Sequence, residues 1–84
     1  MKHADRQTLD LLEPLLSQIR LLETLIERKR GVFYRKGRAF LHFHVDNGAV
    51  YADLRGSAEA DFQRHRVVSA EEQAALLSAA RARL

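Results

Sequence analysis

The stretch VFYRKGRAFLHFHVDNGAVYADLR, from Val32 to Arg55, decides the fold that this sequence predicts. Asn47-Gly48 is typical of a two-residue type I′ turn between antiparallel strands, and Lys36-Gly37 suits a second turn of this kind. Side chains alternate between the two faces of a strand, so residues 39–45 present one apolar face and one face of histidine and aromatic residues. The stretch therefore predicts two consecutive β-hairpins that share a central strand.

The turn at 47–48 sets the register of the second hairpin. It places His42 opposite Asp53 and His44 opposite Tyr51. A slip of one residue would move every side chain to the other face, so this register decides which residues share a surface.

The turn at 36–37 places Phe33 opposite Phe40 in the same way. The hairpins then form one sheet with two different faces. The apolar face, which is the predicted core, collects Val32, Tyr34, Ala39, Leu41, Phe43, Val45, Val50, Ala52 and Leu54. The outer face collects Phe33, Arg35, Arg38, Phe40, His42, His44, Tyr51, Asp53 and Arg55.

A long N-terminal helix is expected to cover the apolar face. Its apolar stripe at helical spacing consists of Leu12, Leu15, Leu16, Ile19, Leu22, Leu25 and Ile26. Asp10 and Glu13 suit a capping box, and Pro14 is tolerated only near a helix start, so the main helix should begin near Asp10. Residues 4–9 should form either a separate turn or a kinked extension of this helix. Gly31 suits the position just after its end, where the basic residues 28–30 complement the helix dipole.

The C-terminal third predicts an edge strand followed by a helix. Asp61 to Val68 suits a fourth strand anchored by Phe62, and its charge density places it at an edge. Ser69 and Glu72 form a capping box that opens an alanine-rich helix. The predicted fold is a single α+β domain over residues 1–84, in the order α-β-β-β-(β)-α, with three to four strands.

Composition bounds the class of protein. The 84 residues suit one small domain, and the absence of cysteine excludes disulfides and cysteine-based metal sites. Basic residues exceed acidic ones by only three, and no apolar run suits a signal peptide or a membrane span. We expect a cytoplasmic protein without a membrane partner.

The chain is short enough that a monomer should be marginally stable, so we expect a homodimer. Leu12, Ile19 and Ile26 stand seven residues apart, which would allow a short coiled-coil seam. The outer aromatic side chains also need cover, either from the C-terminal helix or from a second subunit.

The basic and aromatic residues of the outer face predict a site for nucleic acid or another polyanion, with aromatic rings stacking on bases and cations meeting phosphates. The predicted site consists of Arg28, Lys29, Arg30, Arg35, Lys36, Arg38, Arg55, Phe33, Phe40 and Tyr51. The competing hypotheses are a solvated basic surface and an aromatic face covered by protein.

The histidines of the central strand predict a second kind of site. His42 and His44 lie on one face about 7 Å apart at the backbone, and Asp53 lies opposite His42. Two imidazoles and a carboxylate suit a divalent transition metal as cofactor. The alternatives are an acid–base dyad, or an ordinary His–Asp ion pair with His44 stacked on Tyr51.

No nucleophile elbow, P-loop, dinucleotide fingerprint or zincin motif occurs in the sequence, so nothing in it supports an enzyme. The leading hypothesis is a non-enzymatic binding module that uses the outer sheet face for a polyanion. The second is a metal-binding protein, and the third is a structural partner protein whose outer face is an interface.

The block FYRKGRAFLHFHVDNGAVYADLR at 33–55 and the SAEEQAALL helix at 69–77 resemble segments of small uncharacterised bacterial proteins. The resemblance implies a bacterial, cytosolic, stand-alone domain and carries no known activity. A fainter similarity to the frataxin-like fold family implies helices on one face of an antiparallel sheet. The first helix lacks that family's acidic ridge, so iron handling is not implied.

Overall fold

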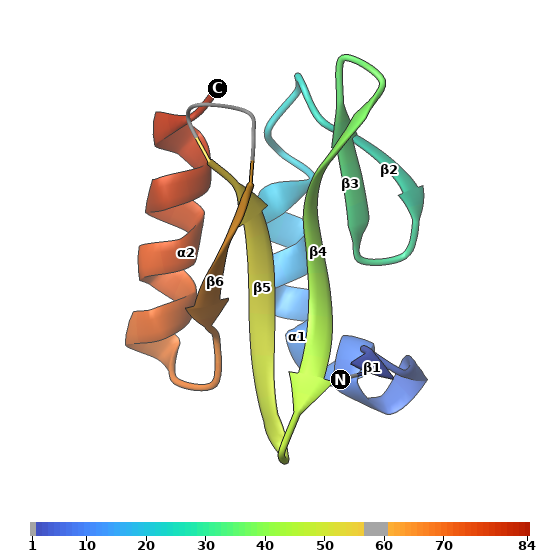
Figure 1. Ribbon diagram of the computed structural model, residues 1–84, viewed down its shortest axis with the longest axis vertical. Coiled ribbons are helices and arrows are strands. Elements are labelled where there is room, and N and C mark those ends of the chain that lie inside the picture. The colour runs from blue at the N-terminus through green and yellow to red at the C-terminus, as the bar shows by residue number, and fades with distance from the viewer. Residues whose placement is uncertain (1, 57–60) are drawn as a thin grey trace.

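The computed structural model describes residues 2–56 and 61–84 (Figure 1). The described elements are β1 (Lys2–His3), α1 (Arg6–Ile19), β2 (Ile26–Lys29), β3 (Val32–Arg35), β4 (Arg38–Asp46), β5 (Ala49–Arg55), β6 (Phe62–Arg66) and α2 (Ala70–Ala82). The α+β class, with one helix near each end of the described chain, is as predicted.

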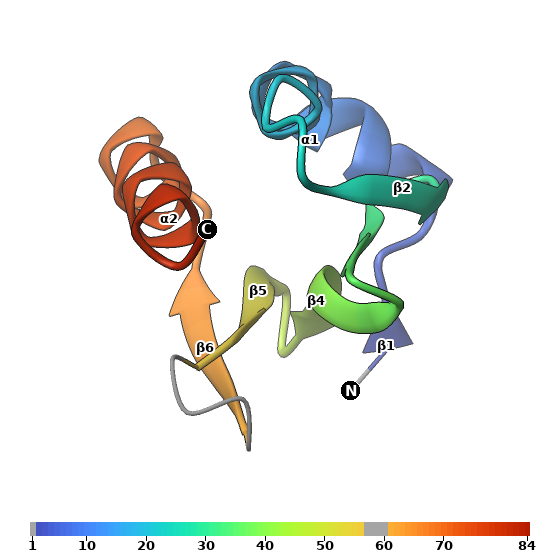
Figure 2. The same ribbon diagram turned by 90° about the horizontal axis from the view of Figure 1, so that it is seen from above.

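The strands form an antiparallel sheet in the order β2-β3-β4-β5-β6. The short β1 pairs with residues 44–45 of β4, whereas β3 pairs with residues 38–41. Both helices lie on the same side of the sheet and leave its other face open (Figure 2). The predicted number of three to four strands is wrong, because β1 and β2 join the strands expected from the sequence.

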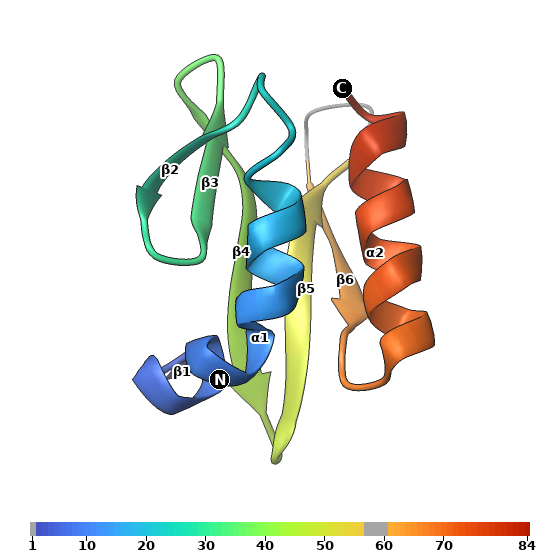
Figure 3. The ribbon, with the colours of Figure 1, turned by 180° about the vertical axis from the view of Figure 1, so that it is seen from behind.

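The first helix begins earlier than predicted. The Asp5 carboxylate accepts a hydrogen bond from the backbone N–H of Thr8 at 2.9 Å and caps α1, so the helix starts at Arg6 and not near Asp10. Residues 6–9 therefore extend the helix, which was one of the two alternatives for this segment, and do not form a separate turn. Pro14 lies inside α1, where it cannot donate a backbone hydrogen bond. Figure 3 shows that α1 changes direction along its length, which fits a proline in the helix interior.

The helix also ends earlier than predicted, at Ile19 rather than near Gly31. Residues 26–29 form the edge strand β2, and Gly31 has a φ of +79° in the turn between β2 and β3. Leu22 and Leu25 still pack against the core, from turns rather than from a helix. Apolar residues three apart suit either conformation, which explains the error.

The predicted coiled-coil seam is wrong for the same reason. Leu12 and Ile19 are buried in the core of the domain, and Ile26 is 61% exposed on β2. The three side chains therefore do not form one stripe on one helix.

The register of the second hairpin is confirmed, with His42 opposite Asp53 and His44 opposite Tyr51. The register of the first hairpin is wrong, because an irregularity places Phe33 opposite Leu41 instead of Phe40. One extra residue in β4 makes a β-bulge, which shifts the side chains that follow. Phe33 is only 1% exposed and Phe40 is also buried, so both phenylalanines belong to the core and not to an open outer face.

The C-terminal elements agree with the sequence. β6 is the edge strand expected from Asp61 to Val68, and it pairs with β5. Ser69 and Glu72 form the predicted capping box at the start of α2. The buried residues of α2 are Leu76, Leu77 and Ala80. None of the described helices is long and apolar enough to cross a membrane.

Candidate metal site on the open face of the sheet

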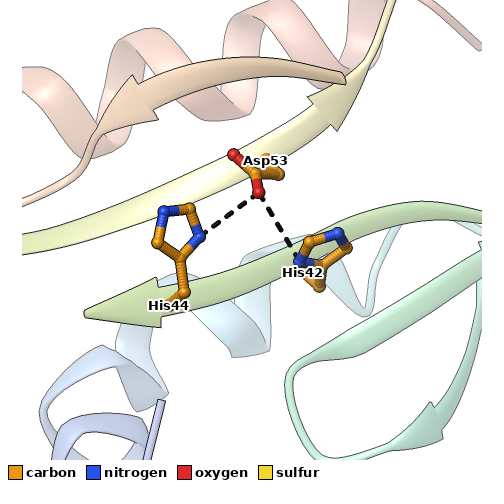
Figure 4. Close-up of side chains that lie close together, drawn as sticks. All are labelled: His42, His44 and Asp53. Carbon is orange, nitrogen blue, oxygen red and sulfur yellow. Dashed lines mark ion pairs between the residues drawn. The ribbon is translucent and has the colours of Figure 1, made fainter. Parts of the chain in front are cut away.

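Two neighbouring strands bring the predicted metal ligands together. His42 and His44 project from β4 and Asp53 projects from β5, all on the face that no helix covers (Figure 4). Nδ1 of His44 lies 3.3 Å from Oδ2 of Asp53, and Nδ1 of His42 lies 3.9 Å from the same oxygen. One ligand atom from each of the three residues lies within 4.8 Å of the others.

His44 is the most constrained member of this triad. It is 3% exposed, and its ring stacks on Tyr51 with the ring centroids 5.7 Å apart. Neither ring nitrogen of His44 has a hydrogen-bond partner in the structure, and Nδ1 of His42 lacks one too. A buried polar atom without a partner costs about 1–3 kcal/mol. The triad therefore holds donor atoms that a ligand would satisfy.

The spacing of the triad is close to that of a metal centre. Zinc–nitrogen bonds of 2.0–2.1 Å place the ligands of a tetrahedral site about 3.4 Å apart. The Nδ1–Oδ2 distance of His44 and Asp53 already has this value within a tenth of an ångström, at 3.3 Å. The His42 nitrogen, at 3.9 Å from the same oxygen, needs a small side-chain movement.

A third histidine, which the sequence pattern did not reveal, lies beside the triad. β1 places His3 opposite His44, on the same face as the triad. The ring centroids of His3 and His42 lie 6.2 Å apart. Nothing in the hairpin sequence signals this neighbour, since His3 lies far upstream and reaches the site only through the pairing of β1 with β4.

Burial lowers the pKa of His42, chiefly because the ring is removed from water. The Asp53 carboxylate acts in the opposite direction, and the nearby His3, His44 and Arg55 add to the lowering. A lowered pKa keeps the imidazole neutral, which is the form that binds a metal ion. The rings of Phe62 and His42 pack in a T-shaped arrangement with their centroids 4.9 Å apart.

The residues of the predicted polyanion site do not form one surface. Arg28 lies over the ring of Tyr34 at 4.7 Å, and Arg30 pairs with Asp10 and Glu13, both at 2.8 Å. Lys29 is exposed on β2.

The remaining residues of that predicted site lie in three other places. Tyr51 covers His44, and Phe33 lies in the core. A pocket at one end of the sheet gathers Arg35, Lys36, Arg38, Phe40 and Arg55, together with Arg83 of the C-terminal segment, which was not among the residues predicted from the sequence.

Comparison of the chain with protein-family models, with curated proteins and with solved structures gave no match. The resemblance to small bacterial proteins stays a prediction. Leu11 and Leu21 are exposed at 80% and 77%, so apolar surface is present that a second subunit would cover. The homodimer itself stays a prediction.

Proposed function

We propose that this chain is a small metal-binding protein that holds one divalent transition metal ion between β4 and β5. His42, His44 and Asp53 would be the ligands, and His3 would be a neighbouring fourth donor. Two imidazoles and a carboxylate suit zinc or ferrous iron. The observation that carries the proposal is the buried His44 ring, whose nitrogens lack hydrogen bonds while Nδ1 lies 3.3 Å from Asp53.

The geometry favours a metal site over an ordinary His–Asp pair. A structural pair is stabilised when an imidazole N–H points at the carboxylate. Here the Nδ1 atoms of His42 and His44 both lie near Oδ2 of Asp53, yet neither makes a hydrogen bond to it. Two nitrogens directed around one carboxylate oxygen suit a shared cation better than a shared proton.

The direct test is a titration of the metal-free protein with Zn²⁺ against a chromophoric chelator, repeated with Co²⁺ to follow the absorption bands of the bound ion. We expect one equivalent to bind. His42→Ala and Asp53→Asn should each weaken binding more than about tenfold, because even partners outside the ligand shell contribute about 10–100-fold. These two positions are preferred to His44, whose replacement would leave a hole beneath Tyr51.

His65→Ala is the matched control. His65 lies on β6, opposite Ala52 of β5. Because Ala52 is a core residue, His65 belongs to the face that the helices cover. Its replacement should leave the affinity unchanged. Binding that is equally strong in His42→Ala, Asp53→Asn and the parent protein would contradict the proposal, as would the absence of any saturable binding.

A further inference from the structure

The end of the sheet opposite the Asn47-Gly48 turn carries a pocket of about 220 Å³. The β3–β4 turn, the end of β5 and the C-terminal end of α2 meet there. Its cationic residues are Arg35, Lys36, Arg38, Arg55 and Arg83, and Phe40 contributes an apolar wall. The pocket shares no residue with the metal triad.

The charge of this pocket is one-sided. Five of its lining residues are cationic, and none of the lining residues in the described part of the chain is acidic. Cations gathered around one cavity repel one another and focus a positive potential into it. An anion in the cavity would relieve this repulsion.

Two guanidinium groups in the pocket carry donors that the protein leaves unused. Nε of Arg35 and Nε of Arg83 are buried, and neither has a hydrogen-bond partner in the structure. Other contacts hold the arginines in place, since Arg83 donates from Nη2 to Gln63 and Arg55 donates from Nε to the Ala39 carbonyl at 2.6 Å. The pocket is therefore ordered by the fold, and two of its arginines each keep a buried N–H group without a partner.

Arginine forks match the oxygens of a phosphate group in both charge and geometry. The cavity is several times larger than the roughly 30 Å³ that one water occupies in the liquid. It therefore has room for a phosphate and part of the group that carries it.

We propose that this pocket binds a phosphate group, either as the free ion or as the phosphate of a nucleotide or of a nucleic-acid strand end. Arg35 and Arg83 would contact the phosphate through their unused Nε–H donors. The polyanion contact expected from the sequence then becomes a single pocket at the end of the sheet and not a track across its face.

The test monitors the Nε–Hε resonances of the arginines by NMR. The probes are inorganic phosphate, adenosine monophosphate, and a short oligonucleotide with and without a 5′-phosphate. We expect saturable shifts of the Arg35 and Arg83 resonances with the phosphate-bearing probes. Binding by inorganic phosphate alone would identify a free-ion site, tighter binding of the monophosphate a nucleotide site, and preference for the phosphorylated oligonucleotide a strand-end site.

Arg35→Gln and Arg83→Gln should each weaken binding about tenfold or more, because a hydrogen bond to a charged group contributes about 1.5–3 kcal/mol. Arg81→Gln is the matched control, since Arg81 is an exposed arginine in the last turn of α2 and does not line the pocket. Lys36→Gln, at the exposed turn, provides a second variant if Arg35→Gln fails to fold. Equal loss in Arg81→Gln, or no saturable shift with any of the phosphate-bearing probes, would overturn the proposal.

Discussion

His3 lies opposite His44 in the antiparallel pairing of β1 with β4. The pairing brings a third imidazole to the open face, and the His3 ring lies 6.2 Å from that of His42, measured between centroids. A strand of two residues therefore extends the candidate metal site beyond the hairpin that supplies its other members.

We expect His3→Ala to weaken Zn²⁺ binding by about 10–100-fold, whether His3 binds the ion or supports the ligands next to it. The affinity would be measured by the same chelator competition as for the triad. Lys2→Ala, at the other residue of β1, is the control. It separates the effect of the His3 imidazole on Zn²⁺ affinity from any effect of altering the strand. An unchanged affinity in His3→Ala would limit the site to His42, His44 and Asp53.

Two phenylalanines of the sheet differ in exposure and should differ in their contribution to stability. Phe33 is 1% exposed in the core, whereas Phe62 is 37% exposed on the open face. Phe33→Ala should lower the free energy of unfolding by about 3–5 kcal/mol because it leaves a cavity. Phe62→Ala should cost about 1 kcal/mol, mainly through lost contacts with His42 and Arg55. Urea denaturation would compare them, and similar losses would place Phe33 on the surface.

Gly31 and Gly37 both have a left-handed backbone, with φ of +79° and +78°. An alanine at either position would cost about 1–2 kcal/mol in that conformation. A Cβ at Gly31 would also lie 2.7 Å from Cδ2 of Leu9, whereas a Cβ at Gly37 meets nothing within 4 Å. Gly31→Ala should therefore destabilise the protein by about 1 kcal/mol or more beyond Gly37→Ala. Equal thermal midpoints for the two variants would show that the β2–β3 turn does not pack on α1.

Glu13 joins α1 to the segment after it. Hydrogen bonds from Arg20 and then from Arg30 lower the pKa of the Glu13 carboxyl from 4.5 to about 2. The unfolded chain binds this proton more readily, so the stabilising contribution is complete above pH 4.5 and is lost as the pH falls toward 2. The carboxyl carbon shift of Glu13 should titrate with this low midpoint.

Glu13→Gln tests the same linkage through stability. Its free energy of unfolding should fall less steeply with acid over this window than that of the parent protein. A smaller slope should remain, because the pKa values of Glu27 and Glu72 are also lowered by hydrogen bonds. Identical slopes in the two proteins would mean that the contacts of Glu13 with the arginines do not form in solution.

Local sequence signals determine much of the fold. Asn47-Gly48 determines a two-residue turn, and that turn determines the pairing of His42 with Asp53. Ser69 and Glu72 determine where α2 begins. In each case the interacting groups are neighbours along the chain, or are counted outward from a short turn. The triad could therefore be identified from the sequence.

Only the tertiary structure decided where α1 ends and where the bulge in β4 shifts the register of the first hairpin. It also decided which residues join the candidate metal site and the cationic pocket from elsewhere in the chain. Residues 20–30 suit a helix by pattern, but pairing with β3 and the contact of Arg30 with Asp10, twenty residues upstream, favour an edge strand. His3 and Arg83 come from opposite ends of the described chain and reach their sites through packing. Such contacts join residues far apart in sequence, and their free energy depends on the whole folded arrangement, so no local pattern encodes them.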